Sequence, residues 1–134
     1  MTEAAEKYYK KLYPDGEWTL AETDPEFAEF FTDFACDEVV GQDDLDDRTR
    51  MMAVLAALLG CQGLDEFKEI LPGALNLGGT PVEVKEIVYQ ACAYLGIGRV
   101  RHFLTAVNEV LSARGIRLPL EGQATTTRDN RIEK

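Results

Sequence analysis

The sequence predicts an all-α fold, a bundle of about six helices. Three observations lead to this prediction. Apolar residues recur every three or four positions through most of the chain. Helix-start signals, in which a capping residue is followed by proline or an acid, occur repeatedly. No segment shows the strict alternation of apolar and polar residues that is typical of a half-buried strand.

Length and composition suit one domain. The chain has 134 residues, of which 46% are hydrophobic, so it can bury a core of its own. Its 24 acidic and 14 basic side chains give a formal net charge of −10, which repels phosphate, so we expect no nucleic-acid partner. No apolar run approaches the roughly 20 residues that cross a bilayer, and the N-terminus lacks the apolar core of a signal peptide. We therefore expect a soluble, cytoplasmic protein with no membrane partner.

The first two predicted helices lie in the first quarter of the chain. Residues 3–12 form a short polar helix, which a turn at residues 13–16 ends. A second helix begins at Asp24-Pro25, where proline takes the first helical position. It carries phenylalanines at positions 27, 30, 31 and 34. A stripe at this spacing predicts packing in the core rather than a ligand box.

Two helices are predicted in the centre of the chain. The segment LDDRTRMMAVLAALLG, residues 45–60, has an acidic first turn that suits a helix dipole. Its residues 51–59 are apolar on all sides, so this helix lies either at the centre of the domain or in a subunit contact. The next helix begins near Leu64 and ends at residues 77–79. Proline at position 72 is expected to kink it.

Two further helices and a tail complete the prediction. Thr80-Pro81-Val82-Glu83 is a capping box that starts one helix. The last helix runs from about Arg99 to Arg114, and the following glycine closes it. From residue 118 the chain is polar and without pattern. We therefore assign residues 1–117 to the helical domain and residues 118–134 to an extended polar tail or linker.

The segments LDDRTR, GALNLGGTPVEVKE and YLG together resemble the carboxymuconolactone decarboxylase family, whose helical domain is shared with the alkylhydroperoxidase D-type proteins. The resemblance implies an alkylhydroperoxidase D-like helical bundle that assembles into trimers or hexamers. The family contains lactone decarboxylases and thiol peroxidases. The tail that begins LPLEGQATTT also resembles the connector that joins two copies of the domain in longer members.

The cysteines form no metal or redox motif. Cys36, Cys61 and Cys92 are widely spaced, and there is one histidine, so we expect no metal site and no cofactor. Peroxidase members of the family use a CxxC pair with a nearby histidine. Here Cys61 stands near the place of the first cysteine, but Leu64 occupies the position three residues on. Cys61 is then either a single-thiol nucleophile or a small residue that ends a buried helix.

Glu66 is the main candidate for acid–base chemistry. Decarboxylase members place a histidine at the position that aligns with Ile70, so that residue is absent here. Glu66 lies one helical turn earlier, at the edge of an apolar stripe, where partial desolvation raises the pKa of a carboxyl group toward general-acid use. The alternative is that Asp65 and Glu66 are first-turn acids that interact with the helix dipole.

His102 is the third candidate. It follows Arg99 and Arg101 and lies opposite the apolar stripe of its helix, so it could join an anion-binding patch at a subunit junction. The alternative is an exposed structural histidine.

Two classes of function remain open. The first is a cofactor-free, lactone decarboxylase-type enzyme acting on a small anionic or carbonyl compound, with Glu66 as acid or base and Cys61 and His102 as lesser catalytic candidates. The second is a non-catalytic binding or assembly module of the same fold, or a single-thiol, peroxidase-like antioxidant protein. The missing CxxC pair and histidine leave open whether catalysis is retained. A homo-oligomer, trimer or hexamer, is expected in either case.

Overall fold

The structure, a computed structural model, describes residues 1–16, 18–42 and 44–121. These residues form helices and turns and contain no strand, so the all-α prediction is confirmed. The elements are α1 (Glu3–Leu12), α2 (Leu20–Thr23), α3 (Pro25–Asp33), the π-helical turn η1 (Phe34–Glu38), the 3-10 turn η2 (Val40–Gln42), α4 (Asp47–Gly60), α5 (Leu64–Asn76), α6 (Pro81–Leu95) and α7 (Ile97–Ala113).

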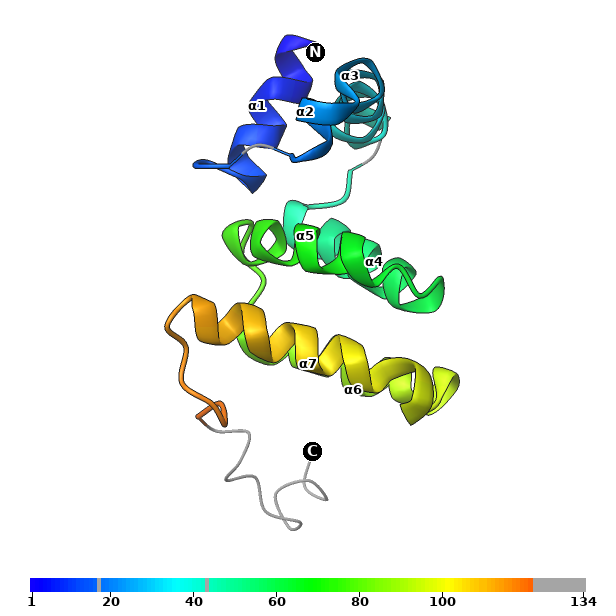
Figure 1. Cartoon of the computed structure of the whole chain (residues 1–134), viewed down its shortest axis with the longest axis vertical. Helices are drawn as coiled ribbons and strands as arrows, with labels where there is room; N and C mark the ends of the chain where they lie inside the picture. The colour runs from blue at the N-terminus through cyan, green and yellow to red at the C-terminus, as the bar shows by residue number, and fades with distance from the viewer. Residues whose placement is uncertain (17, 43, 122–134) are drawn as a thin grey trace.

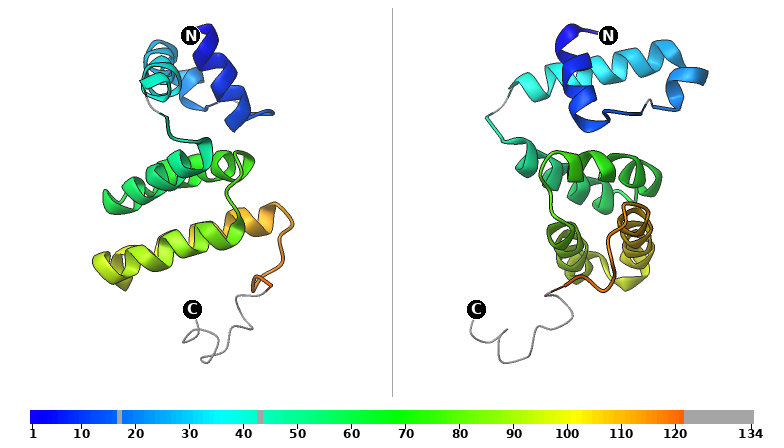
Figure 2. Two further views of the ribbon diagram at one scale, coloured as in Figure 1. Left: turned by 180° about the vertical axis from the view of Figure 1, so that it is seen from behind. Right: turned by 90° about the vertical axis from the view of Figure 1, so that its left-hand side faces the viewer.

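The helices stack in three layers (Figures 1 and 2). The first layer, which we call the N-terminal layer, contains α1, α2, α3 and η1. The pair α4 and α5 forms the middle layer, and the pair α6 and α7 forms the third. The middle pair contacts both neighbours, since α5 touches α1 and α7 and α4 touches α6.

The main core lies between α4, α5, α6 and α7. Its centre is an edge-to-face pair of fully buried rings, Phe67 of α5 and Phe103 of α7, with centroids 5.1 Å apart. Leucines and valines at helical spacing surround this pair, as the apolar stripes predicted. They include Leu55, Leu59, Leu71, Val84, Val88, Val100, Val107 and Leu111. Helix α5 is helical on both sides of Pro72.

Helices α3, α4 and α6 begin at the predicted start signals, although the Asp24 side chain makes no capping hydrogen bond at α3. Asp46 accepts a hydrogen bond from the backbone N–H of Thr49 at 2.7 Å and begins α4. Thr80 and Glu83 form the complete capping box of α6. The Glu83 carboxylate also pairs with Arg48 of α4. The LDDRTR and TPVE segments thus tie two layers together, and their visible role is structural.

The N-terminal layer packs in an unexpected way. The phenylalanines of α3 and η1 are exposed in the single chain, with 64% of Phe30 accessible, so the prediction that this stripe packs in the core is wrong for one chain alone. Helix α3 instead buries Ala28 and Thr32. Small side chains let α1 approach α3 closely, and a larger residue at either position would hold the helices apart.

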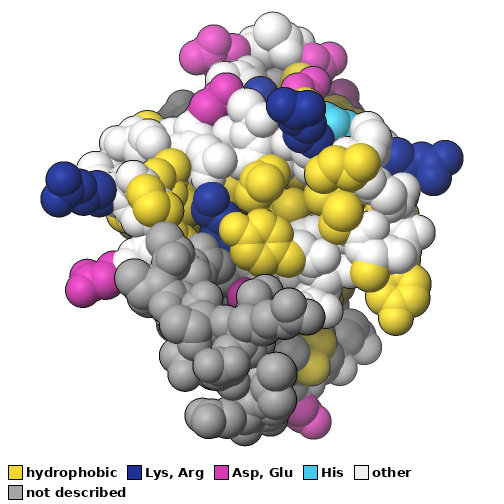
Figure 3. All heavy atoms as spheres, turned by 90° about the horizontal axis from the view of Figure 1, so that it is seen from below, with side chains coloured by type: hydrophobic (Ala, Val, Ile, Leu, Met, Phe, Trp, Pro, Cys, Tyr) yellow, Lys and Arg dark blue, Asp and Glu magenta, His cyan; other side chains and the backbone are white. Residues whose placement is uncertain are grey.

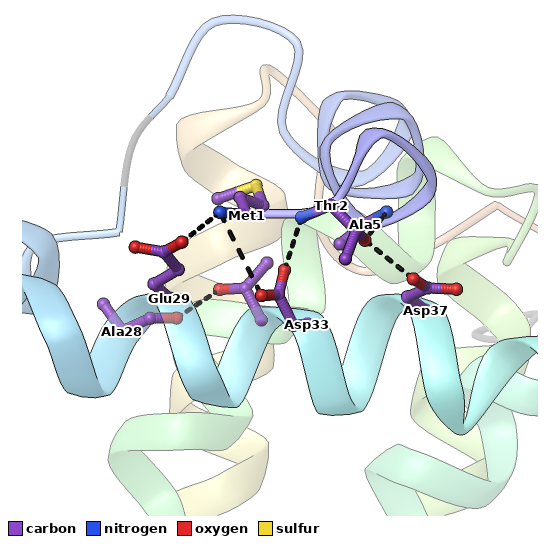
Figure 4. Close-up of polar contacts among 8 residues, drawn as sticks. Met1, Thr2, Ala5, Ala28, Glu29, Asp33 and Asp37 are labelled. Atoms are coloured by element: carbon purple, nitrogen blue, oxygen red, sulfur yellow. Dashed lines mark hydrogen bonds and ion pairs between the residues drawn. The ribbon is translucent and has the colours of Figure 1, made fainter.

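Polar contacts also hold α1 against α3 (Figure 4). The backbone N–H of Thr2 donates to Asp33 at 2.7 Å, and its hydroxyl donates to Asp37 at the same distance. The amine of Met1 pairs with Glu29. These residues lie at the surface, so the packing of α1 on α3 depends on exposed polar bonds more than on buried apolar area.

The chain stays on the core after α7 ends. Gly115, with φ of 79°, turns it, and Leu120 is buried beside the partly buried Leu118. The predicted tail begins at residue 118, and its residues 122–134 lie outside the described part of the chain. Within the described part, the helices are too short or too polar for a membrane span.

Candidate functional site

The turn between α4 and α5 holds two of the three candidate residues. Helix α4 ends in a Schellman-type turn, in which the N–H of Gly63 donates to the Leu58 carbonyl at 2.8 Å. Gln62 takes the left-handed position, with φ of 63°, where glycine is more usual. Its side-chain amide donates to the Leu59 carbonyl at 2.8 Å, which fixes the turn without glycine at that position.

Gly63 leaves room for the side chains of two candidate residues. A Cβ atom at this position would lie 3.5 Å from Cys61 Sγ and 3.4 Å from Glu66 Oε2, so both atoms border the space beside its Cα. Both residues are exposed. The burial that the sequence predicted for Glu66 is therefore absent in the single chain. The Cys61 thiol contacts the Leu58 carbonyl at 3.6 Å.

His102 lies in a separate cavity at the start of α7. This cavity of about 460 Å³ is lined by Ile97, Gly98, Arg101, His102 and Thr105. We call it the α7 pocket. Helix α7 has no side-chain cap and no acidic residue in its first turn, so its N-terminal N–H groups and positive dipole end are unopposed by a carboxylate of the helix itself.

The α7 pocket carries unpaired positive charge. Neither Arg99 nor Arg101 forms an ion pair with the described carboxylates. Figure 3 shows the histidine on the outer face of the third layer with basic side chains beside it and apolar side chains next to them. The Thr105 hydroxyl donates to the Arg101 carbonyl at 3.3 Å. The guanidinium and the imidazole around one cavity suit a carboxylate or a polarised carbonyl oxygen.

The two groups of candidates lie at the same end of the helix stack. The α4–α5 turn and the α6–α7 turn are neighbours at one end of the middle and third layers (Figures 1 and 2). The residues that follow Glu66 and His102, Phe67 and Phe103, are the two rings in contact at the core centre. However, neither Cys61 nor Glu66 lines the α7 pocket. One chain therefore brings Cys61 and Glu66 together and leaves His102 apart.

Two positions that the resemblance assigns to reactive residues belong to the core instead. Leu64, three residues after Cys61, and Ile70 both pack against the buried cluster. These side chains stabilise α5 against its neighbours, and they offer no proton or thiol.

The other thiols are less accessible. Cys36 and Cys92 are partly buried, and all three cysteines are free. Burial raises the pKa of Cys36 to about 11, so it is a thiol at neutral pH. Within residues 1–16, 18–42 and 44–121, no three histidine, cysteine or acidic side chains cluster as a metal site would require.

The sequence alone missed part of the pocket lining. Thr105 follows Arg101 and His102 by four and three residues, so helical spacing could have placed it on the same face. Ile97 and Gly98 belong to the first turn of α7, which begins two residues before the predicted start.

Two comparisons with known proteins bear on this site. The model of the carboxymuconolactone decarboxylase family matches residues 25–109. A 4-carboxymuconolactone decarboxylase from Acinetobacter baylyi is 29% identical over 97 residues, which cover 72% of this chain and 72% of that protein. The matched segment of the family model contains the α4–α5 turn and the whole α7 pocket.

Proposed function

The chain belongs to the carboxymuconolactone decarboxylase family, and on that premise we propose that it performs lactone decarboxylase-type acid–base chemistry on a small anionic or carbonyl compound. The observation that supports the proposal most is the α7 pocket, whose Arg101 and His102 offer donors to an anion. The relative from Acinetobacter baylyi is named for this kind of reaction.

The reaction needs two kinds of group. Breaking the carbon–carbon bond to a carboxylate releases CO₂ and leaves the electron pair on the substrate, where a conjugated lactone carbonyl delocalises it. Donors near that carbonyl oxygen stabilise the charge as it develops, and Arg101 and His102 supply them in this proposal. A proton then returns to carbon. Glu66 is our first candidate for the acid or base, and Cys61 and His102 are lesser candidates.

A second copy of the chain completes this arrangement in our proposal. Tyr94 is 92% exposed, and Ile97, which lines the pocket, is also exposed. Helix α4 presents Met52 and three exposed alanines, Ala53, Ala56 and Ala57. Together with the exposed phenylalanines, these surfaces favour a homo-oligomer, a trimer or a hexamer. The three free cysteines favour a reducing, cytoplasmic location.

The second candidate is a non-catalytic binding or assembly module. Leu64 and Ile70 favour it, because core packing occupies the two positions at which relatives keep reactive residues. A single-thiol, peroxidase-like activity rests on the exposed Cys61 alone.

Binding is tested first, because the chain has one histidine and hence one imidazole spectrum. We expect the His102 resonances in proton NMR to shift saturably as a lactone carboxylate is added. Arg101→Gln should weaken that binding about tenfold, which corresponds to loss of one charge-assisted hydrogen bond. Arg117→Gln, a change outside the pocket, is the matched control. Resonances that do not move would contradict the proposed anion site.

Catalysis is tested separately. Lactone carboxylates are incubated with wild type, Glu66→Gln and the neighbouring Asp65→Asn, and CO₂ release is measured. We expect Glu66→Gln to lower kcat by about 10²-fold or more, as loss of a general acid or base does, and Asp65→Asn to leave it unchanged. Equal rates in all three proteins would remove Glu66 from the mechanism. Binding without turnover would favour the non-catalytic module.

A further inference from the structure

The N-terminal layer contains a second, larger cavity that the proposed chemistry does not use. It measures about 720 Å³ and lies between α1 and the segment that leads into α3. Three aromatic rings line it: Tyr9 and Tyr13 from α1, and Trp18 from the connection before α2. We call it the aromatic cleft. It shares no lining residue with the α7 pocket.

The rings of the cleft are fixed in place. Tyr9 and Tyr13 stand one helical turn apart, with ring centroids 5.2 Å apart. The Tyr13 hydroxyl donates to the Glu69 carbonyl at 2.9 Å, and the Trp18 indole N–H donates to the Glu69 carboxylate at 2.9 Å. Helix α5 thus holds the polar tips of these two side chains. What remains for a ligand in the cleft is the surface of the rings.

The charge around the cleft favours cations. Glu6, Asp15 and Glu29 line it. Two ammonium groups of the chain already lie there, since Lys10 pairs with Glu6 at 3.0 Å and the Met1 amine pairs with Glu29 (Figure 4). The hydrogen bond to Glu29 raises the pKa of that amine, so these surroundings favour its charged form.

Asp15 is the carboxylate of the cleft that no described group neutralises. It forms neither an ion pair nor a hydrogen bond with the described side chains. It lies two residues after Tyr13, on the turn that joins α1 to Trp18. An aromatic surface beside an unpaired carboxylate is the combination that binds alkylated ammonium groups, because the ring faces and the carboxylate both attract positive charge.

We propose that the aromatic cleft binds a small organic cation with an alkylated ammonium group. The alkyl groups lie against Tyr9, Tyr13 and Trp18, and the charge lies near Asp15. Helix α3 turns Ala28 and Thr32 toward α1 and the cleft, and its Phe31 ring packs against Trp18 with centroids 5.3 Å apart. Phe27, Phe30 and Phe34 do not line the cleft, so a second chain that covers them does not by itself fill it. The proposal is independent of the chemistry at α7.

The test uses Trp18, the one tryptophan of the chain, whose fluorescence reports directly on the cleft. The full-length protein is titrated with choline chloride and, in parallel, with 3,3-dimethyl-1-butanol, the neutral molecule of the same shape. Sodium chloride keeps the ionic strength constant. We expect a saturable change with choline, half-complete at about 1 mM or below, and a response at least tenfold weaker with the neutral molecule.

A pair of variants assigns the effect to the cleft. Asp15→Asn should weaken choline binding about three- to tenfold, as loss of one partly screened charge does. Asp65→Asn, at an exposed position of α5 outside the cleft, should leave it unchanged. The proposal is overturned by an equal response to both probes, by the absence of saturation with choline, or by equal weakening in the two variants.

Discussion

The N-terminal layer and the α4–α7 core differ in where they place their phenylalanines: the core buries them, and the N-terminal layer exposes them. The core buries its large rings, Phe67 and Phe103, and exposes small residues along α4. The N-terminal layer buries Ala5 and Ala28, contributes Tyr8 and Leu12 to the core cluster, and exposes its phenylalanines. Both regions have amphipathic helices. The comparison teaches that an apolar stripe identifies a face that must be covered, but it does not tell whether the same chain covers it.

The N-terminal layer meets the core where α1 contacts α4 and α5, a contact that we call the joint. The backbone carbonyl of Leu12, at the end of α1, accepts from the Asn76 side chain at 2.7 Å. Its side chain packs so closely on Gly73 that a Cβ there would lie 2.9 Å from Leu12 Cδ2. Asp47 of α4 accepts from Lys11 at 2.7 Å. Tyr8 and Leu12 of α1 also join the buried core cluster, and Tyr13 and Trp18 donate to Glu69 of α5, so the joint combines apolar packing with polar bonds.

The largest expected effect comes from the core. Phe67→Ala removes a fully buried ring and its edge-to-face partner contact, so we expect the free energy of unfolding to fall by about 3–5 kcal/mol. Urea denaturation followed by circular dichroism measures it. Lys68→Ala, at the next residue of α5, whose side chain is exposed, is the control and should change stability by less than about 0.5 kcal/mol. Similar losses in both variants would break the comparison, because burial would then not decide where stability lies.

The next effect concerns the exposed rings of the N-terminal layer. If a second chain covers them, replacing Phe30 and Phe34 with serine should weaken self-association by about 10²-fold, as loss of two interface rings does. Light scattering at micromolar concentration should give three or six times the chain mass of 14.9 kDa for the wild type and a smaller mass for the variant. Glu26→Gln, on the same helix, is the control. A wild-type particle of 14.9 kDa would contradict both the assembly and a site built between subunits.

Much of the fold could be predicted because its signals are local. The capping box at Thr80 and Glu83, the cap at Asp46 and the glycine after α7 each act within a few residues, and each appears in the structure as expected. The four-residue helix α2 was not predicted, since so short a segment carries no periodicity.

The site was predicted less completely because its geometry is not local. Cys61 and Glu66 are five residues apart, and one turn brings them together around Gly63. His102 comes from another helix, and the sequence could not tell how far α7 would hold it from the turn. The sequence did not predict the aromatic cleft for the same reason. Tyr9 and Trp18 belong to different elements, and the turn between them decides that they face one cavity.

The smallest expected effect sharpens the comparison at the joint itself. The hydrogen bond from Lys11 holds the pKa of Asp47 below its usual range. A carboxyl group whose pKa is lowered in the folded state stabilises the protein above its unfolded pKa of about 3.9, and this stabilisation is lost as the pH falls through the folded value. Because Asp47 is partly exposed and its partner Lys11 lies at the surface, we expect this pair to contribute no more than about 0.5 kcal/mol.

The measurement is the urea midpoint of Trp18 fluorescence at pH 6 and at pH 3, which follows the N-terminal layer. Lys11→Met removes the cation that pairs with Asp47 across the joint and leaves Arg50 of α4 as its other partner, so the midpoint should depend less on pH in this variant than in the wild type. Lys10→Met is the matched control, because Lys10 pairs with Glu6 inside α1 and does not cross the joint. If the two variants lose the same pH dependence, the joint is not held by the Lys11–Asp47 pair. Packing of Leu12 on Gly73 would then carry it, and the N-terminal layer would resemble the core more than its exposed phenylalanines indicate.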